Sequence, residues 1–452
     1  MSRLLKKTLK FPALILARLG IVWPFVLVYA RIIEEVKPQG SRGEGKPTLL
    51  ALTSKRFLGD LEVLAGSGEF RVLKVPYSWK GRLLTLFYPA DLSREQYFNP
   101  DANARVARAR ESYRAFLRAF LPRLYRRLGV DCVIGPAVHY VEDLDWGRVS
   151  EEIGVPYVVL HRENLAASSA RVKFYTDRCR KLGKFQGSHI ITHNEIIREI
   201  FVRSGYVAPD NITSLGCLRM DEFVRKVRAH KGGSNSRKKV VFFSFLPGTS
   251  LSGLASLWPS DRNVGLVNFF EHTHAAFGEL ARDHPEVDFV IKPKWSGRWV
   301  DEVEKVLRSN GIAPERCRNL SILPRGNVHE LILESDVVCG YGSTTLLEAG
   351  ITGKPVIVPH FEETLSPEYR DYILFQEHFH LFDIAGSPAE LKSLILERLR
   401  DPAVDEACMA ARRVAFEETV SSLKSDATAK YTALLKKVIE DRRSPVGSPA
   451  GA

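Results

Sequence analysis

The sequence from Val337 to Gly350, VVCGYGSTTLLEAG, carries more information about the architecture than any other stretch of the chain. An apolar run over 337–339 leads directly into Gly340 and Gly342, and three hydroxyl residues then precede a helical pattern. A second apolar run, VIVP, follows shortly after the helix. Strand, turn, helix and strand in succession are typical of a parallel α/β sheet. Glycines let the backbone approach a ligand closely, and free N–H groups at a helix start attract phosphate. The stretch therefore predicts an anion-binding turn.

The same alternation of apolar runs and helical patterns extends outward from this turn. Predicted strands in the first half are 48–52, 70–75, 131–135, 156–161, 187–194 and 211–216. Predicted strands in the second half are 238–245, 287–292, 320–323, 336–340 and 354–359. A basic, Gly/Ser-rich segment over 225–238, RKVRAHKGGSNSRK, separates the two series and is typical of a linker. We therefore expect an α/β protein with two successive domains facing across a cleft, in which ligands bind at the strand ends.

At 452 residues the chain exceeds one ordinary core. The expected organisation assigns a role to each range of the sequence. The ranges are an N-terminal segment 1–46, a first domain 47–224, the linker 225–238, a second domain 239–402, C-terminal helices 403–440 and a disordered tail 441–452. A long amphipathic helix over 101–128 is also expected, kinked or divided at Pro122.

The positive charge of the chain is localised. Residues 1–46 carry nine Lys/Arg against three acids, and residues 101–130 carry eight Arg against two acids. These two segments account for the whole net charge of +12. Such clustering indicates an anionic partner surface, a membrane or a nucleic acid, while a solvated helix face is the alternative for 101–130. Six cysteines stand singly with no C-x-x-C pair, so we expect neither a disulfide framework nor a zinc knuckle, and a reducing compartment.

The N-terminal segment pairs basic residues with the apolar run FPALILARLGIVWPFVLVYARII. Pro12, Arg18 and Pro24 interrupt the run, and no small-residue cleavage site follows it. A monotopic amphipathic element on an anionic leaflet is the favoured interpretation, and a core-packed helix and a true span are the alternatives. The expected location is cytoplasmic, peripheral at the inner face of the cytoplasmic membrane.

Two interpretations of Glu348 remain open. In the first, Thr345-Leu-Leu-Glu348 forms a capping box that only closes the helix start. In the second, Glu348 accepts hydrogen bonds from the ribose hydroxyls of a nucleotide. The turn itself is not a Walker A loop, since no Lys-Ser/Thr closes it, and Thr345 stands where a dinucleotide-binding turn has its third glycine.

The run from Ser335 to Ile357 resembles the nucleotide-sugar site of GT-B fold glycosyltransferases. It is most similar to bacterial surface-carbohydrate enzymes, the capsule and lipopolysaccharide transferases, and to CDP-glycerol glycerophosphotransferases. Three further stretches resemble units of these families: Val290-Ile-Lys-Pro-Lys294, His193-Asn194-Glu195, and the run Thr213 to Asp221. The resemblance implies two Rossmann-like domains. It departs from the family pattern at Lys294, where a histidine is usual.

The resemblance implies a set of residues that bind the nucleotide-sugar. They are Lys292, Lys294, Gly340, Gly342, Ser343, Thr344, Thr345 and Glu348. No metal site is expected, because no Asp-x-Asp motif stands at a strand end; Asp143 and Asp145 are the nearest approach and are expected in a surface loop. No cofactor is expected beyond the nucleotide-sugar co-substrate.

A metal-independent transfer by inversion needs a base that deprotonates the acceptor hydroxyl. Glu163 is the first candidate, His161 the second and Asp60 the third, all at expected strand ends of the first domain. The histidines His272, His274 and His139 are weaker candidates for a place near the phosphates or the base.

The expected function is a glycosyltransferase that moves a sugar from a nucleotide donor to a surface polysaccharide or glycolipid acceptor at the membrane. The enzymatic alternatives are polyol-phosphate transfer from a CDP donor and a nucleotide-sugar 2-epimerase of the same fold. A nucleic-acid-binding protein is disfavoured because no interleaved aromatic residues accompany the arginines. A catalytically inactive scaffold is the remaining alternative. The expected partners are therefore the donor, the acceptor and an anionic membrane surface, and no nucleic acid.

Overall fold

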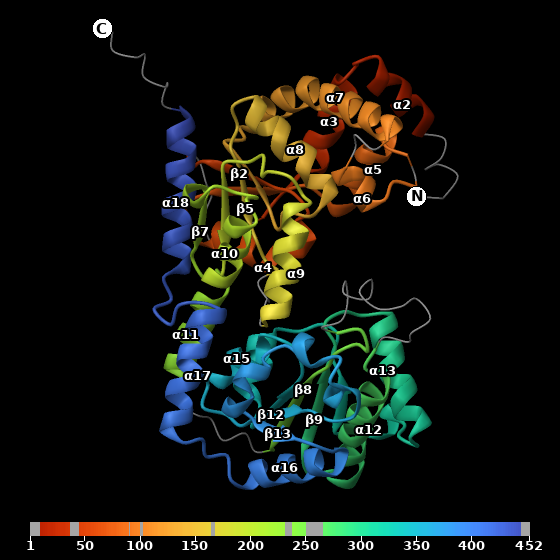
Figure 1. Ribbon diagram of the computed structural model, residues 1–452, viewed down its shortest axis with the longest axis vertical. Coiled ribbons are helices and arrows are strands. Elements are labelled where there is room, and N and C mark those ends of the chain that lie inside the picture. Colours follow the sequence, from red (N-terminus) through yellow and green to blue (C-terminus); the bar gives the residue numbers. More distant parts are fainter. Residues whose placement is uncertain are drawn as a thin grey trace. The chain divides into compact units, whose positions relative to one another are not determined.

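A computed structural model describes residues 10–36, 45–89, 91–99, 103–163, 168–230, 237–249 and 265–443 (Figure 1). The chain forms two compact units, of which the first comprises Met1–Asn164, Thr176–Asp221 and Ser425–Ala452. The second comprises Leu165–Tyr175 and Glu222–Lys424. Each unit is built on one sheet that is mainly or wholly parallel. The predicted α/β class with two Rossmann-like domains is confirmed.

The first unit contains a seven-stranded sheet in the order β1-β3-β2-β4-β5-β6-β7. Its strands are β1 (Glu34–Glu35), β2 (Thr48–Ala51), β3 (Arg71–Lys74), β4 (Cys132–Gly135), β5 (Tyr157–Leu160), β6 (His189–Thr192) and β7 (Ile212–Ser214). All pairings are parallel except that of β1 with β3, in which Glu34 lies opposite Lys74. Every residue of β2, β4, β5 and β6 is buried. Burial on both faces explains why these strands read as continuous apolar runs.

Helices of the first unit include the N-terminal segment and a long arginine-rich helix. They are α2 (Lys10–Arg18), α3 (Trp23–Ile32), α4 (Leu58–Gly66), α5 (Tyr77–Phe87), α6 (Arg94–Phe98), α7 (Ala104–Leu128), α8 (Val141–Glu152), α10 (Glu195–Arg203) and α18 (Ala427–Arg443), with the 3-10 turns η1 (Ser54–Arg56) and η3 (Pro209–Asn211). Helix α7 begins after Asn103, whose side chain accepts hydrogen bonds from the N–H groups of Arg105 and Val106. Pro122 lies inside α7 and does not divide it, so that part of the prediction is wrong.

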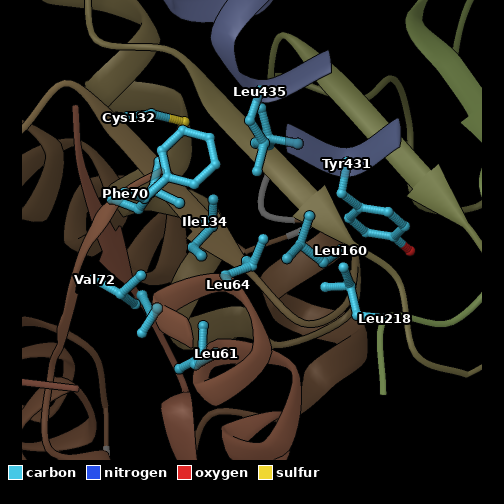
Figure 2. Packing of buried hydrophobic residues seen from close by; sticks show 14 of the residues in the cluster. Leu61, Leu64, Phe70, Val72, Cys132, Ile134, Leu160, Leu218, Tyr431 and Leu435 are labelled. Atoms are coloured by element: carbon cyan, nitrogen blue, oxygen red, sulfur yellow. The ribbon is translucent and has the colours of Figure 1, made fainter. Parts of the chain in front are cut away.

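The last helix of the chain completes the first core. Tyr431, Leu435 and Ile439 of α18 pack with residues of α4 and of the sheet, among them Leu61 and Ile134 (Figure 2). The N–H groups at the start of α18 donate to the buried carboxylate of Asp221, at 3.1 Å from Ala427 and 2.7 Å from Thr428.

The second unit contains a six-stranded parallel sheet in the order β10-β9-β8-β11-β12-β13. Its strands are β8 (Lys239–Phe243), β9 (Asp288–Lys292), β10 (Leu320–Ile322), β11 (Val337–Gly340), β12 (Val356–Pro359) and β13 (Asp383–Ala385). Its helices are α12 (Val267–Asp283), α13 (Arg298–Ser309), α14 (Val328–Glu334), α15 (Thr345–Gly350), α16 (Pro388–Arg400) and α17 (Glu406–Thr419), with the 3-10 turns η5 (Pro314–Arg316), η6 (Glu362–Leu365), η7 (Arg370–Tyr372) and η8 (Gln376–Leu381). The strand order 3-2-1-4-5-6 is that of the Rossmann fold.

The bounds of the units differ from the expected domain bounds at several places, among them Leu165–Tyr175, which falls in the range expected for the first domain but belongs to the second unit. Helices α17 and α18 were expected together over 403–440, yet α17 belongs to the second unit and α18 to the first, and α18 continues to Arg443, so the expected start of the disordered tail at 441 is wrong. Helix α11 (Met220–Ala229) runs into the expected linker, and α9 (Ser169–Arg180) was not expected. The predictions for residues 1–9, for 37–44 at the end of the N-terminal segment, for the centre of the linker over 231–236 and for the tail beyond Arg443 concern residues outside the described part of the chain.

Candidate functional site

The order of the second sheet identifies the edge where a ligand would bind. The chain crosses from β8 to β9 on one side and returns to β11 on the other, so the switch in direction lies between β8 and β11. In open α/β sheets ligands bind outside the carboxyl ends of the strands at this switch. Lys292, Phe243 and Gly340 end their strands in register across β9, β8 and β11. Strand spacing places the Cα atoms of Lys292 and Gly340 about 10 Å apart.

The turn from β11 into α15 has the backbone that its glycines predict. Gly342 has a φ of 62°, in the left-handed region where a side chain is strained. A Cβ on Gly340 would lie 3.2 Å from Cδ2 of Leu346, which is a tight contact. Tyr341 stands between the two glycines in the sequence. Its ring is buried against Phe245 and Phe269 and holds the turn against the core of the unit.

Hydroxyl groups line this turn as the sequence indicates. The N–H of Thr345 donates to Oγ of Ser343 at 3.3 Å. The Oγ1 atom of Thr345 is buried and has no hydrogen-bond partner among the described residues. Helix α15 has only six residues, so its dipole adds little, and anion binding here depends on the hydroxyls and backbone N–H groups of the turn.

Glu348 is the buried acid of this site, with 2% of its surface exposed. Oγ1 of Thr344 donates to its Oε1 at 2.9 Å, and Nε2 of His329 lies 3.3 Å from its Oε2. Thr344 occupies the N-cap position with no side-chain cap hydrogen bond, and Thr345 is already the first helical residue. The capping box proposed for Thr345 and Glu348 is therefore not formed. The ribose interpretation of Glu348 stays a prediction.

His329 is a residue of this site that sequence reasoning missed. It lies in the first turn of α14, where Asn327 caps the helix by accepting from the N–H groups of His329 and Glu330. Its ring stacks on Phe223 with the centroids 4.2 Å apart. The capping Asn-x-His at the start of a helix just before β11 was the available signal, but no local pattern in the sequence links it to Glu348.

The two lysines expected to neutralise a diphosphate have different surroundings. Lys292 is buried, and its Nζ donates to the carbonyl oxygens of Pro293 at 2.8 Å and Pro324 at 3.3 Å. Burial lowers the pKa of this ammonium. Lys294 is exposed, and its Nζ lies over the ring of Trp295, 5.1 Å from the centroid. Only Lys294 is presented to solvent in the free protein.

The histidines of α12 have separate roles in the structure. His274 is fully buried, its Nδ1 bonds to the carbonyl of Phe270 at 2.6 Å, and its Nε2 lies 2.8 Å from Oγ of Ser244. Oγ of Ser244 also accepts from Nε1 of Trp299 at 3.0 Å. Burial lowers the pKa of His274 to about 4, so the neutral ring fixes Ser244 just beyond β8. His272 instead pairs with Glu362 at 2.9 Å.

A second set of polar side chains gathers at the carboxyl edge of the first sheet. Asp60, in the first turn of α4, is buried, and its Oδ2 forms an ion pair with Nε of Arg162 at 3.0 Å. Its Oδ1 has no hydrogen-bond partner among the described residues. The switch in strand order of this sheet lies between β2 and β4, and the chain reaches α4 from β2 through the short 3-10 turn η1. Asp60 is thus fixed in place near the edge that ligands of such sheets use.

The other two base candidates differ from Asp60. His161 is buried, its Nε2 lies 3.2 Å from the carbonyl oxygen of Glu163, and burial lowers its pKa to about 4. A base works best with a pKa near the working pH, so His161 is poorly tuned. The Glu163 side chain is exposed. The ring of His139 lies 6.4 Å from that of His161.

The first unit also contains cationic groups that sequence reasoning did not place in the site. Burial and the charges of Arg219, Arg162 and His161 all lower the pKa of His193, so these four groups lie close together. Arg162 directly follows the expected strand 156–161, and Arg219 lies three residues beyond the expected strand 211–216. With Arg162 paired to Asp60 and Arg219 close to His193, this part of the first unit suits an anionic or polyhydroxyl ligand.

Asp143 and Asp145 do not lie in a surface loop, so that expectation is wrong. Both carboxylates are fully buried in α8. Asp143 accepts from Oγ1 of Thr53 at 2.8 Å, and Asp145 accepts from Tyr88 at 2.9 Å and pairs with Arg114 at 2.6 Å. These contacts join α7, α8 and the segment after β2, which makes the two acids structural. Within the described ranges, no group of three His, Cys, Asp or Glu residues is placed to hold a metal ion.

The fold defines the chain as an α/β protein with two parallel Rossmann-like sheets, the GT-B-like fold. Its structure is similar to that of a putative UDP-N-acetylglucosamine 2-epimerase from Listeria monocytogenes, with a TM-score of 0.51 and 12% identity over 88% of this chain and 98% of that one. The UDP-GlcNAc 2-epimerase from Neisseria meningitidis has a TM-score of 0.47 at 13% identity, covering 86% and 100% of the two chains. The wall teichoic acid polymerase TagF has a TM-score of 0.44 at 13% identity, covering 74% and 76%. No protein-family model and no curated protein sequence matches the chain.

Proposed function

We propose that this protein is a GT-B fold enzyme that acts on a nucleotide-activated sugar, and that the donor binds at the carboxyl edge of the second sheet. The observation that carries the proposal is the buried Glu348 carboxylate, which is oriented by Thr344 and His329 beside the glycine turn. Two carboxylate oxygens held by side chains make a rigid acceptor for a pair of ribose hydroxyls. The neighbouring turn offers hydroxyls and backbone N–H groups to a diphosphate.

The expected chemistry is transfer of the sugar to a hydroxyl of a surface glycan or glycolipid. The bond between C1 of the sugar and the diphosphate oxygen breaks, and a bond from C1 to the acceptor oxygen forms. The proton of the acceptor hydroxyl passes to a base, for which Asp60 is the best fixed of the three candidates. Ser343 and Lys294 would stabilise the charge that develops on the departing diphosphate.

A second candidate is a nucleotide-sugar 2-epimerase, which the similarity of fold to the putative Listeria monocytogenes enzyme favours. Such an enzyme converts the donor without any acceptor. Polyol-phosphate transfer from a CDP donor is the third reaction class that the sequence resemblance left open, and it would release CMP.

A ligand screen tests the proposal. The purified protein is heated with UDP, GDP, CDP, CMP or ADP, and a nucleotide present at 100 times its Kd stabilises the native state by about 2.7 kcal/mol. We expect one nucleotide to raise the Tm of the wild type and to have a much smaller effect on Glu348→Gln. Glu330→Gln is the control, because Glu330 is exposed one residue beyond His329. If none of the nucleotides raises the Tm, the proposal is wrong.

Product analysis then separates the reaction classes. Incubation of the corresponding nucleotide-sugar without acceptor yields an epimerised donor only for an epimerase. Release of nucleoside diphosphate that depends on an added glycan acceptor identifies a glycosyltransferase, and release of CMP from CDP-glycerol identifies a polyol-phosphate transferase.

A further inference from the structure

The outer faces of α2 and α3, with the connection between them, expose a concentration of large apolar side chains. Thirteen large apolar residues are exposed in the described part of the chain, and six of them lie within the short range 15–28. The six are Ile15, Leu19, Ile21, Trp23, Leu27 and Val28. A concentration of exposed large apolar side chains is typical of a surface that contacts a protein or a membrane. These six residues are called the apolar face below.

The opposite side of the same segment is fixed to the first unit. Val26 and Tyr29 of α3 are buried, and the Tyr29 hydroxyl donates to the carbonyl of Trp79 at 2.8 Å. The Phe25 ring lies edge-on to Phe116 of α7, with the centroids 5.1 Å apart. The core-packed alternative for this segment therefore describes its inner side. Because that side is held by packing, the apolar face is a fixed feature of the surface.

The geometry of the segment suits binding at a membrane surface better than spanning the bilayer. Among the described residues no single helix is long and apolar enough to span, and the pair Pro12–Arg18 and Trp23–Ile32 meets that test only together, with a bend of 118°. Each helix is about 15 Å long at 1.5 Å per residue, half of the hydrocarbon thickness of about 30 Å. An amphipathic element in the interface needs to insert only about 5–10 Å.

Exposed arginines lie on the same segment as the apolar face and on the neighbouring helix α7. Arg18 and Arg31 are exposed on the same segment. The contacts of Phe25 with Phe116 and of Tyr29 with Phe120 show that α3 and α7 run parallel, so the residues before Trp23 lie toward the first half of α7. That half carries the exposed Arg105 and Arg108. In the sequence, the apolar face is also preceded by Arg3, Lys6 and Lys7.

We propose that the outer faces of α2 and α3 dock this protein on an anionic lipid bilayer, with the six apolar side chains inserted and the arginines at the headgroups. Each cation near an anionic membrane surface contributes about 1 kcal/mol, and the buried apolar area adds to this. Trp23 suits the boundary, since an indole prefers the headgroup level. A second copy of the chain is a less suitable partner for the apolar face. A two-fold contact would bring the arginines of the two copies close together.

Vesicle co-sedimentation of the full-length protein tests the proposal. We expect the wild type to bind vesicles containing one third anionic phosphatidylglycerol at least tenfold more tightly than vesicles of phosphatidylcholine alone. The double substitution Trp23→Ser/Leu27→Ser should lose at least tenfold of that affinity. Arg18→Glu/Arg31→Glu should lose the preference for anionic vesicles. Val414→Ser is the control, since Val414 is an exposed apolar residue of α17 in the other unit, and its affinity should not change.

A second measurement uses Trp23 without removing the apolar face. Lipids with brominated acyl chains should quench part of the fluorescence, and Trp23→Phe should abolish that part while binding persists. The proposal is overturned if the wild type does not bind anionic vesicles, if the apolar double variant binds as well as the wild type, or if the wild type forms a lipid-independent dimer that this variant abolishes. The nucleotide-induced Tm shift of every variant should equal that of the wild type, which separates this inference from the proposed function.

Discussion

Nε2 of His329 lies 3.3 Å from Oε2 of Glu348, and the two residues come from the consecutive helices α14 and α15 on either side of β11. The imidazole is held in turn by its stacking on Phe223 and by the helix start at Asn327. Glu348 therefore has a fixed orientation before any ligand arrives. An acceptor that is already oriented loses less conformational entropy on binding.

The first prediction concerns this carboxylate. Glu348→Gln keeps the shape of the side chain but removes its charge, so the hydrogen bonds to ribose hydroxyls become weaker. Hydrogen bonds to charged groups are worth about 1.5–3 kcal/mol, so we expect the Kd for the nucleotide identified in the screen to rise about 10–100-fold. Isothermal titration calorimetry measures it, and the exposed Glu330→Gln should bind as the wild type does. An unchanged Kd would exclude Glu348 from the nucleotide site.

His329 should act through Glu348 and not by touching the nucleotide. His329→Gln should weaken binding less than Glu348→Gln does. The double variant should be little weaker than Glu348→Gln alone, with a coupling energy of about 0.5–3 kcal/mol. Additive effects of the two substitutions would show that His329 contributes independently of Glu348.

The second prediction concerns the turn. Gly342→Ala forces a Cβ into a left-handed conformation at φ 62°, at a cost of about 1–2 kcal/mol. We expect a lower Tm together with weaker nucleotide binding, and a smaller loss for Gly342→Asn, because asparagine tolerates this conformation better. Gly205→Ala is the matched control, since Gly205 has a φ of 72° and open space around it. It should lower the Tm and leave nucleotide affinity unchanged.

Much of the second unit could be predicted from its sequence because the relevant signals are local. The alternation of apolar runs with helical patterns, together with the spacing of the glycines, located β8, β9, β11 and β12 to within a few residues. The short strand β13 was missed, because three residues between the 3-10 turn η8 and helix α16 carry no periodic pattern. The same locality explains why the turn at Gly340 was found and its partner His329 was not. The pairing of His329 with Glu348 depends on how α14 packs on α15.

Tertiary context also explains the errors in the first unit. Asp143 and Asp145 were expected at the surface because a charged pair is rarely buried. Their partners Thr53, Tyr88 and Arg114 come from distant parts of the chain, and no local pattern announces them. The position of α18 likewise depends on contacts across more than 200 residues of sequence.

The third prediction tests the base. Asp60→Asn preserves the shape of the side chain beside Arg162, but the amide cannot take a proton. Loss of a general base typically lowers the rate by about 10²–10⁴-fold. We expect acceptor-dependent release of nucleoside diphosphate to fall by that amount, with the nucleotide Kd unchanged. Glu62→Gln on the exposed side of α4 is the control. Glu163→Gln should reduce the rate less than Asp60→Asn does. The reverse order would make Glu163 the better candidate for the general base.

The fourth prediction concerns acid stability. Burial lowers the pKa of His274 to about 4 from an ordinary value of 6.5, so the unfolded chain binds a proton that the folded chain refuses. Above pH 6.5 the ring is neutral in both states and the free energy of unfolding is at its full value. As the pH falls from 6.5 to about 4, the unfolded chain takes up the proton and the free energy of unfolding decreases. Its slope is about 1.4 kcal/mol per pH unit over that window. Urea midpoints from pH 4.5 to 6.5 should rise less steeply for His274→Gln than for the wild type, and exposed His230→Gln should not alter the slope.

The fifth prediction concerns the capping of the last helix by Asp221. Its buried carboxylate accepts from the N–H groups of Ala427 and Thr428, and the Tyr431 hydroxyl one turn later donates to the carbonyl of Gly216 at 2.9 Å. Loss of a helix cap costs about 1–2 kcal/mol, and the two N–H groups would also be left without their acceptor. We expect Asp221→Ala to lower the free energy of unfolding by at least that amount and to expose α18 to limited proteolysis. Asp210→Ala, at an exposed 3-10 turn, should do neither. If α18 were a dispensable extension, Asp221→Ala would unfold at the same urea concentration as the wild type, and the assignment of α18 to the first core would be wrong.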